Sequence, residues 1–197
     1  MTNQNFNNSN ESKKDSLPSK GKILISEPFI QDNVFSRSVI YLIDCSDEGS
    51  IGLVLNKNFP LDVNDIVKSL KETNNIPLFC GGPVGSDTLF YLHNLNNISN
   101  AIDAGNGLYL NGNFEQIKNY KLNNEEIEGH IRFFLGYSGW DKGQLMNEIK
   151  MKTGVVSSCS IEETMNTKNT TIWDNSVLDL GNKYKIWTHF PYNPTLN

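Results

Sequence analysis

Runs of apolar and β-branched residues, separated by turn residues, predict that most of the chain folds into short strands. The first strand is expected over residues 22–26. Residues 37–44 are apolar almost throughout, which is typical of a strand covered on both faces. Residues 51–56 are expected to return as the second strand of a hairpin. Gly52 inside that strand indicates a bulge or a close approach by another backbone.

Apolar residues at helical spacing predict helices between the strands. Val63, Ile66, Val67 and Leu70 share one helix face, which predicts a helix that begins at Asp62. Further helices are expected after Asn113, around Leu145 and Ile149, and over 173–180 before Gly181. Further strands are expected over 76–80, 88–93, 108–110 and 131–135. Because strand pairs close by short turns and helices are irregularly spaced, the pattern favours a single α+β domain.

The first twenty residues differ from the rest of the chain. Residues 1–20 are rich in Asn, Ser and Lys and have almost no apolar side chains to bury, so we expect a disordered tail, with one domain over 21–197. The tail has no apolar segment typical of a secretory signal. No run in the chain approaches the roughly 20 apolar residues that a membrane helix needs. These features predict a cytoplasmic protein with no membrane association.

The net charge and the cysteine spacing narrow the range of possible functions and cellular compartments. The net charge is −5, and Arg37 and Arg132 are the only arginines, which argues against direct nucleic-acid binding. The three cysteines, Cys45, Cys80 and Cys159, are odd in number and widely spaced. We therefore expect free thiols in a reducing compartment rather than a disulfide framework.

The segment 136–145 concentrates three glycines, two aromatic residues and a helix start in ten residues. We interpret it as strand, turn and helix, with Asp141 as the N-cap and Gln144 completing a capping box. Its spacing matches neither a dinucleotide-binding nor a Walker motif. Tyr137 and Trp140 are either core residues beside a tight turn or the apolar wall of a binding site.

Other candidate residues also have two interpretations. Gly81-Gly82-Pro83 reverses the chain, or leaves a bare backbone wall for a ligand. Arg37 either anchors an anionic group or pairs with an internal carboxylate such as Asp32 or Asp44. The histidines and cysteines lack metal-ligand spacing, Ser138 is not in a nucleophile elbow, and no carboxylate pair stands out. We therefore predict no metal, no cofactor and no serine or metal hydrolase activity.

Several motifs together resemble the AlgH/YqgE family of bacterial proteins. They extend from about Lys20 to the end of the chain and are far more specific together than singly. The motifs are 21–25 followed by Pro28, 35–42, 49–56, 81–84, Leu92-His93, and 136–140 followed by 143–145.

The resemblance implies an α+β fold in which a bent, mostly antiparallel sheet forms a pseudo-barrel flanked by helices. It also implies a cytoplasmic bacterial protein whose biochemical activity is unassigned. The name AlgH comes from a proposed role in regulating alginate synthesis, although no helix-turn-helix pattern is present in this sequence.

We predict a non-enzymatic binding or regulatory protein that recognises a peptide or small anionic ligand at one concave, glycine-rich cleft, with an unknown protein or small molecule as its partner. Two alternatives stay open: an enzyme of unrecognised class acting at the same cleft, and a transcriptional regulator. The predicted ligand-binding residues are Arg37, Asn56, Gly81, Gly82, Pro83, His93, Tyr137, Ser138, Gly139 and Trp140.

Overall fold

A computed structural model describes residues 17–123 and 126–191. Within these residues the strands are β1 (Ile23–Ser26), β2 (Val39–Ser46), β3 (Gly49–Val54), β4 (Asn58–Asp62), β5 (Pro77–Cys80), β6 (Val84–His93), β7 (Ile102–Gly105), β8 (Leu108–Leu110), β9 (Ile131–Asp141) and β10 (Gly154–Ser157). The α-helices are α1 (Val63–Ile66), α2 (Phe114–Asn123), α3 (Gln144–Lys150), α4 (Ile161–Met165) and α5 (Ile172–Asp179). Lys68–Leu70 and Lys185–His189 form 3₁₀ turns.

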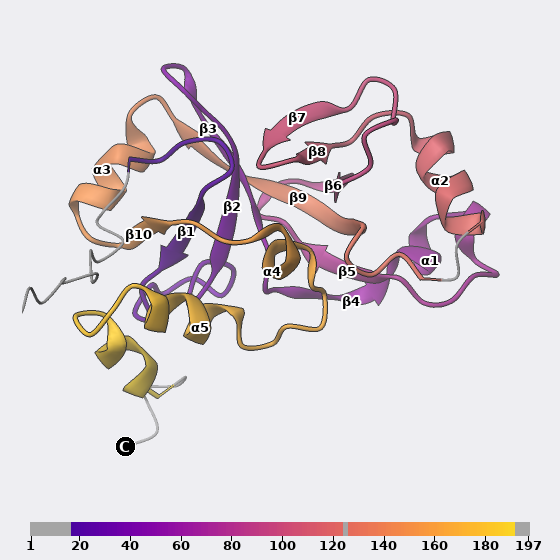
Figure 1. The fold of residues 1–197 in the computed structure, drawn as a ribbon. Helices are drawn as coiled ribbons and strands as arrows, with labels where there is room; N and C mark the ends of the chain where they lie inside the picture. The colour runs from indigo at the N-terminus through magenta and orange to yellow at the C-terminus, as the bar shows by residue number, and fades with distance from the viewer. Residues whose placement is uncertain (1–16, 124–125, 192–197) are drawn as a thin grey trace, which may run out of the picture.

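The strands form one strongly bent sheet whose two halves share the long strand β9. The order of the main path is β10-β1-β2-β3-β9-β6-β8-β7, and β4 and β5 lie beside it. Most neighbours are antiparallel, and β5 pairs parallel to β9. Figure 1 shows β9 passing from the half that carries α3 to the half that carries α1 and α2. The α+β class and the helix-flanked antiparallel sheet are therefore confirmed, although β10 and β7 do not pair and the described sheet stays open.

The connection from β5 to β6 crosses over β9 in close backbone contact. Strand β5 pairs with residues 133–135 of β9 on one edge, whereas β6 pairs on the other edge and Val84 lies opposite Tyr137. A Cβ atom on Gly81 would lie 2.2 Å from the Gly136 carbonyl oxygen, and one on Gly82 would lie 2.2 Å from the Tyr137 carbonyl carbon. Only glycine fits at these two positions because the crossing leaves no room for a side chain.

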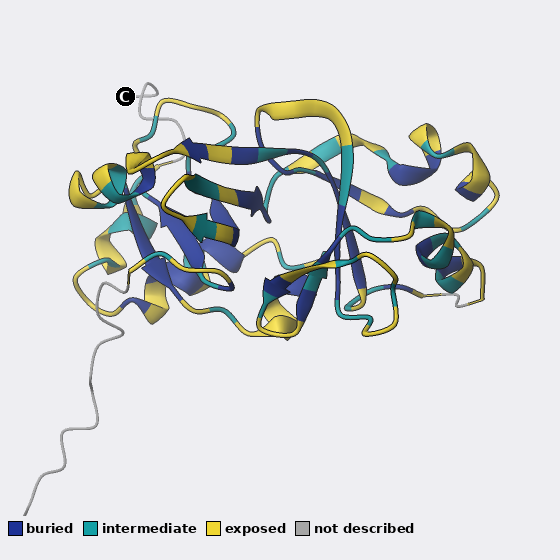
Figure 2. Cartoon of the chain, turned by 90° about the horizontal axis from the view of Figure 1, so that it is seen from above, coloured by how far each residue is buried: buried dark blue, intermediate teal, exposed yellow. Residues whose placement is uncertain are grey.

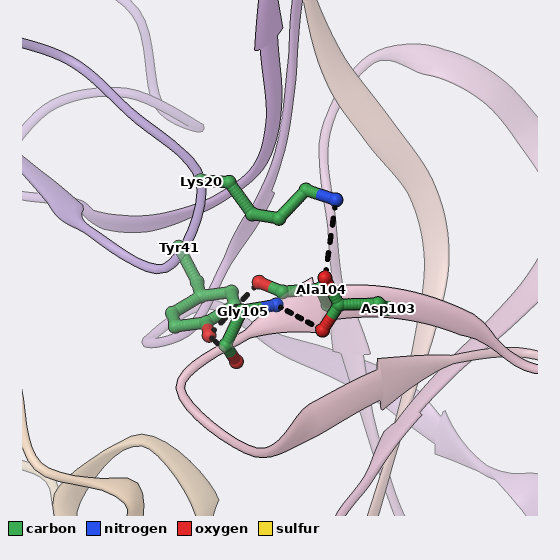
Figure 3. A network of polar contacts seen from close by, with 5 residues as sticks. All are labelled: Lys20, Tyr41, Asp103, Ala104 and Gly105. Carbon is green, nitrogen blue, oxygen red and sulfur yellow. Dashed lines mark hydrogen bonds and ion pairs between the residues drawn. The ribbon is translucent and has the colours of Figure 1, made fainter.

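Tyr41 holds the bent sheet together where β2 meets the hairpin of β7 and β8. Its buried hydroxyl donates to the carbonyl oxygens of Ala104 and Gly105, at 3.1 and 2.9 Å (Figure 3). Beside it, Lys20 Nζ lies 3.3 Å from an Asp103 carboxylate oxygen. Burial, followed by the Asp103 charge, raises the pKa of Tyr41 well above its usual range, so this tyrosine stays a neutral hydrogen-bond donor.

Three apolar clusters fill the molecule. The largest lies inside the bend of the sheet and is closed by α5, which contributes Trp173 and Val177. A second cluster packs beneath α1 and α2 and includes Phe133 of β9 and Ile117 of α2. The third packs between α3 and the opposite face of β1 to β3. Figure 2 shows the same pattern, with buried strands in the middle and exposed residues on the helices and loops.

Local patterns predicted most elements correctly. The hairpin of β2 and β3, helix α2 and helix α5 form as expected, and Gly181 follows α5 with a positive φ of 93°. The close approach by another backbone expected at Gly52 is confirmed, because a Cβ atom there would lie 2.9 Å from the Tyr41 carbonyl oxygen.

The helix expected over 62–70 is interrupted after one turn. Asp62 is the N-cap as predicted, but Val67 is extended and only a 3₁₀ turn follows. The buried Asn64 side chain donates to the Leu70 carbonyl oxygen and accepts from the Ile76 amide at 2.8 Å. This side chain folds the following loop back on itself, and its bonds replace those of a longer helix.

The interpretation of 136–145 as strand, turn and helix is wrong at its centre. Strand β9 continues to Asp141, and Gly143, rather than Asp141, is the N-cap of α3. The Gln144 side chain still accepts from the Asp141 amide at 3.0 Å, which is the second half of the expected capping box. Gly136 and Gly139 therefore lie within the strand, and only Lys142 and Gly143 form the turn before α3. Gly136, with a φ of 68°, lies where the β5–β6 connection crosses the strand.

The predicted disordered tail, residues 1–20, lies outside the described residues except for its last four. Of these, Lys20 contacts Asp103, and the Ser19 carbonyl oxygen accepts from the Lys22 amide at 3.1 Å. The chain is therefore attached to the β7–β8 hairpin one residue before Gly21, where order was expected to begin.

Candidate functional site

An apolar pocket of about 310 Å³ lies between α3 and the outer face of the sheet. The loop between β1 and β2 contributes Ile30 and Phe35 to it, and α3 contributes Gln144, Glu148 and Ile149. Its remaining lining residues are Leu24, Ser26, Ile40, Gly139, Trp140, Thr153 and Gly154. We call this the Trp140 pocket. Its size is at the lower end of the range of small-ligand sites.

The polar groups of the Trp140 pocket are connected. Trp140 Nε1 donates to Glu148 Oε2 at 2.9 Å, and Gln144 Nε2 donates to Glu148 Oε1 at 2.9 Å. Thr153 binds back to the Glu148 carbonyl oxygen through both its amide and its hydroxyl, at 3.2 and 3.1 Å. The Glu148 carboxylate is thus held in one orientation beside an indole ring and apolar walls.

Helical spacing places Gln144 and Glu148 together, and strand pairing and core packing bring Trp140 beside them. Gln144 and Glu148 are four residues apart on α3, so they lie on the same helix face. Trp140 lies opposite Ser50 of β3, and its ring passes beside Gly52, where a Cβ atom would lie 3.4 Å from it. Leu145 packs into the third cluster and fixes α3 over the sheet.

The four predicted site residues of β9 point to alternate faces of the strand. Trp140 and Ser138 are buried, and Gly139 is exposed. Gly139 and Trp140 line the pocket. Ser138 Oγ donates to the Gly81 carbonyl oxygen at 3.2 Å. Tyr137 packs edge-on against Phe90, with 5.6 Å between ring centroids.

The predicted glycine wall is covered by the chain itself. Gly81 and Gly82 are buried against the backbone of residues 136–138, and Pro83 is exposed next to them. The Gly81 amide donates to the Leu135 carbonyl oxygen and its own carbonyl accepts from the Val54 amide. These contacts join β9 to the ends of β5 and β3.

Arg37 and Asn56 form a second group at the ends of β2 and β3. Asn56 accepts from the Val39 amide at 2.9 Å and donates to the Arg37 carbonyl oxygen at 2.8 Å. The Arg37 guanidinium is buried, donates to the carbonyl oxygens of Phe190 and Pro191, and lies 4.9 Å from the centre of the Trp173 ring. Arg37 therefore binds the C-terminal segment of its own chain.

His93 lies in a third place, in the half of the sheet opposite the pocket. It pairs with Ile131 at the far end of β9 from Trp140. Its ring is buried, stacks on Tyr91 and Tyr109, and bonds through Nε2 to the Asn111 carbonyl oxygen at 2.9 Å. Burial lowers the pKa of His93, so the ring is neutral at pH 7.

The predicted site residues thus divide into a β9 group with Gly81 to Pro83, an Arg37–Asn56 pair, and His93. Ligand binding by any of them stays a prediction. Sequence reasoning missed Glu148, Gln144, Ile30 and Phe35, which line the pocket beside Trp140. The spacing of Gln144 and Glu148 places them on one helix face, but nothing in the sequence pairs that face with Trp140.

A second, more polar cavity of about 440 Å³ lies near the Arg37–Asn56 pair. Lys57 and Cys80 both line it. Lys57 Nζ donates to the Ser36 carbonyl oxygen at 2.7 Å, and burial lowers its pKa. None of Cys45, Cys80 and Cys159 forms a disulfide. Within the described ranges no three His, Cys, Asp or Glu side chains cluster as metal ligands.

Among residues 17–123 and 126–191, no helix has both the length and the apolar character to cross a membrane.

Sequence comparisons show the family. A profile described as AlgH-like matches residues 23–185. This chain belongs to the AlgH-like family. It is 51% identical to a UPF0301 protein of Bacteroides thetaiotaomicron, over 92% of both chains. A UPF0301 protein of Parabacteroides distasonis is 45% identical over 93% of both chains. The resemblance inferred from the motifs is therefore confirmed.

Two solved structures share the fold. A crystal structure of a Corynebacterium diphtheriae protein matches with a TM-score of 0.73 at 19% identity, covering 89% of this chain and 94% of that one. The solution structure of the AlgH protein from Pseudomonas aeruginosa matches with a TM-score of 0.67 at 23% identity, covering 90% and 98%. At these identities the likeness shows that the fold is shared.

Proposed function

We propose that this AlgH-like protein is a non-enzymatic, cytoplasmic binding protein whose ligand site is the Trp140 pocket. The observation that carries the proposal is the arrangement of the pocket. Apolar side chains from the sheet, the β1–β2 loop and α3 surround a few oriented polar groups, which is the usual composition of a small-ligand site. Of the predicted site residues, Gly139 and Trp140 belong to it.

The chemistry of the lining supports binding over catalysis. Among the described lining residues there is no histidine or cysteine to act as a base or nucleophile. Ser26 Oγ is hydrogen-bonded to Ser38 Oγ at 2.8 Å. Glu148 accepts from two neutral donors, which hold its carboxylate in place. A regulatory role, as the AlgH name suggests, would then act through the bound ligand or partner.

The proposal is tested by titrating ¹⁵N-labelled protein with 2-phenylethanol, a small neutral probe with an apolar ring. We expect saturable shifts of the Trp140 indole N–H and of the Gly139 and Gly154 amides, because these groups surround the pocket. The variant Ile149→Asp places a charge on an apolar wall and should abolish the saturation. Shifts scattered over the protein, or unchanged in Ile149→Asp, would contradict the proposal.

A matched control is Ile161→Asp, which introduces the same charge at an exposed position of α4 away from the pocket. It should bind the probe as the parent protein does. Binding of duplex DNA is measured at several salt concentrations to test the alternative of a transcriptional regulator. A salt-sensitive complex at physiological salt would favour that alternative over a ligand-binding protein.

A further inference from the structure

We propose that the Trp140 pocket selects small organic cations, and that Glu148 is the residue that recognises the positive charge. This inference rests on the proposed function and names the class of ligand. It departs from the anionic ligand expected from the sequence, because the only ionisable group among the described lining residues is the Glu148 carboxylate.

The charge of Glu148 is not matched within the described part of the chain. The ion pairs found there join Lys20 to Asp103, Lys118 to Glu115, Lys142 to Glu48, and Lys168 to Glu126. Glu148 instead accepts from the neutral Trp140 indole and the neutral Gln144 amide. These donors orient the carboxylate without neutralising it, so a net negative charge faces the pocket.

The carboxylate can accept further hydrogen bonds. Each of its oxygens has one bond of 2.9 Å from the protein. A carboxylate offers about four lone-pair sites in all, so both oxygens can accept from an ammonium group as well. Because two side chains already fix the carboxylate, little ordering is needed when a ligand arrives.

The walls of the pocket strengthen this preference. Leu24, Ile30 and Ile40 make the lining beside the charge apolar, and an ion pair is stronger where the surroundings are less polar. Trp140 adds an aromatic ring, the best side chain for contacting a cation. The same fold already places cations over rings elsewhere, with Arg132 at 4.1 Å from the Phe79 ring centre. The negative charge of Glu148 would repel an anionic ligand.

The volume limits the size of the ligand. At about 310 Å³, the pocket suits an amine with a single ring or a short chain rather than a folded peptide segment. We therefore assign it a small molecule with an apolar body and one ammonium group.

Three probes of similar size and different charge test the assignment: phenethylamine, 2-phenylethanol and phenylacetate. At pH 7 the amine is protonated, as lysine is. Calorimetry or NMR titration should show phenethylamine binding at least about ten-fold more tightly than 2-phenylethanol, which corresponds to about 1.4 kcal/mol. Phenylacetate should bind most weakly, because its carboxylate would face Glu148.

The variant Glu148→Gln removes the charge and keeps an oxygen that accepts from Trp140 or Gln144. It should bring the affinities for phenethylamine and 2-phenylethanol to within about two-fold of one another. The matched control Glu162→Gln changes an exposed carboxylate on α4 and should preserve the ten-fold preference. Thermal unfolding of both variants checks that the fold is intact.

The outcomes separate the two proposals. If 2-phenylethanol binds at Trp140 and phenethylamine binds no more tightly, the charge selectivity is overturned and the proposed function stands. If none of the probes binds there, both are overturned. If Nα-acetyl-lysine methylamide binds more tightly than phenethylamine, the pocket recognises lysine side chains of a protein partner, and the small-molecule assignment is wrong.

Discussion

The two halves of strand β9 belong to one continuous β-strand but have different surroundings. Residues 131–135 lie between β5 and β6, and Phe133 and Phe134 project into separate apolar clusters with no exposed surface. In the other half, Gly139 is exposed and Trp140 faces a pocket. Between them, the backbone of Gly81 and Gly82 crosses the strand.

The difference comes from what covers each half. Around residues 131–135, helix α2 and the second cluster cover one face of the strand. The largest cluster, inside the bend of the sheet, covers the other face. Around Trp140, the short helix α3 contributes Leu145 to the core, while Gln144 and Glu148 stand at the pocket. A pocket therefore arises where a polar helix face meets an apolar strand face, whereas Gly81 and Gly82 lie where two backbones touch.

The largest effect is expected at the crossing between the two halves. Gly82→Ala should lower the free energy of unfolding by about 4 kcal/mol or more, because the added Cβ would meet the Tyr137 backbone at 2.2 Å and φ is +152°. Gly129→Ala is the control, since its φ of +78° is also positive but nothing lies within 4 Å. It should cost about 1–2 kcal/mol. Urea denaturation measures both, and equal losses would refute the crossing as the reason for glycine.

A smaller loss of stability is expected in residues 131–135, the half of β9 that is covered on both faces and is here called the closed half. Arg132 is fully buried there and donates to the carbonyl oxygens of Thr164, at 2.7 Å, and Leu55. Arg132→Met should lower the free energy of unfolding by about 2–3 kcal/mol, because both carbonyls lose their donor. Chemical denaturation provides the measurement.

Arg37→Met is the matched comparison for Arg132→Met. Its acceptors, Phe190 and Pro191, belong to a partly exposed segment and can bond to water instead, so the loss should be about 1 kcal/mol. If Arg37→Met costs as much as Arg132→Met, burial of the acceptors is not what distinguishes the two arginines.

The smallest effect is a pH dependence that belongs to the closed half. Burial lowers the pKa of His93, so the folded state binds a proton less readily than the unfolded state. Stability is therefore complete above the ordinary histidine pKa of about 6.5 and falls as the pH drops toward the lowered folded value. Melting temperatures between pH 7.5 and 5 should show the decrease.

Two variants isolate this contribution. His93→Gln should flatten the decrease, while His189→Gln, at an exposed position, should leave it unchanged. A decrease of the same size in His93→Gln would assign it to other groups.

Local sequence was a good guide where neighbouring residues decide the conformation. The hairpin of β2 and β3 and helix α5 follow directly from apolar spacing and turn residues. The helix predicted over 62–70 failed because Asn64 bonds to residues six to twelve positions away, which no helical pattern reveals. Gly52 was recognised as a close approach, since a glycine within a strand has few other reasons to be there.

The sequence by itself determined the family, the α+β class and the order of most strands and helices, because these depend on spacing and composition along the chain. Only the tertiary structure decided which residues the glycines and Trp140 contact. Gly81 and Gly82 are required by a backbone more than 50 residues away, and Trp140 forms its pocket with residues from β1, the β1–β2 loop and α3. Contacts of that kind depend on how separate segments pack in space, so the spacing of residues along the chain does not predict them.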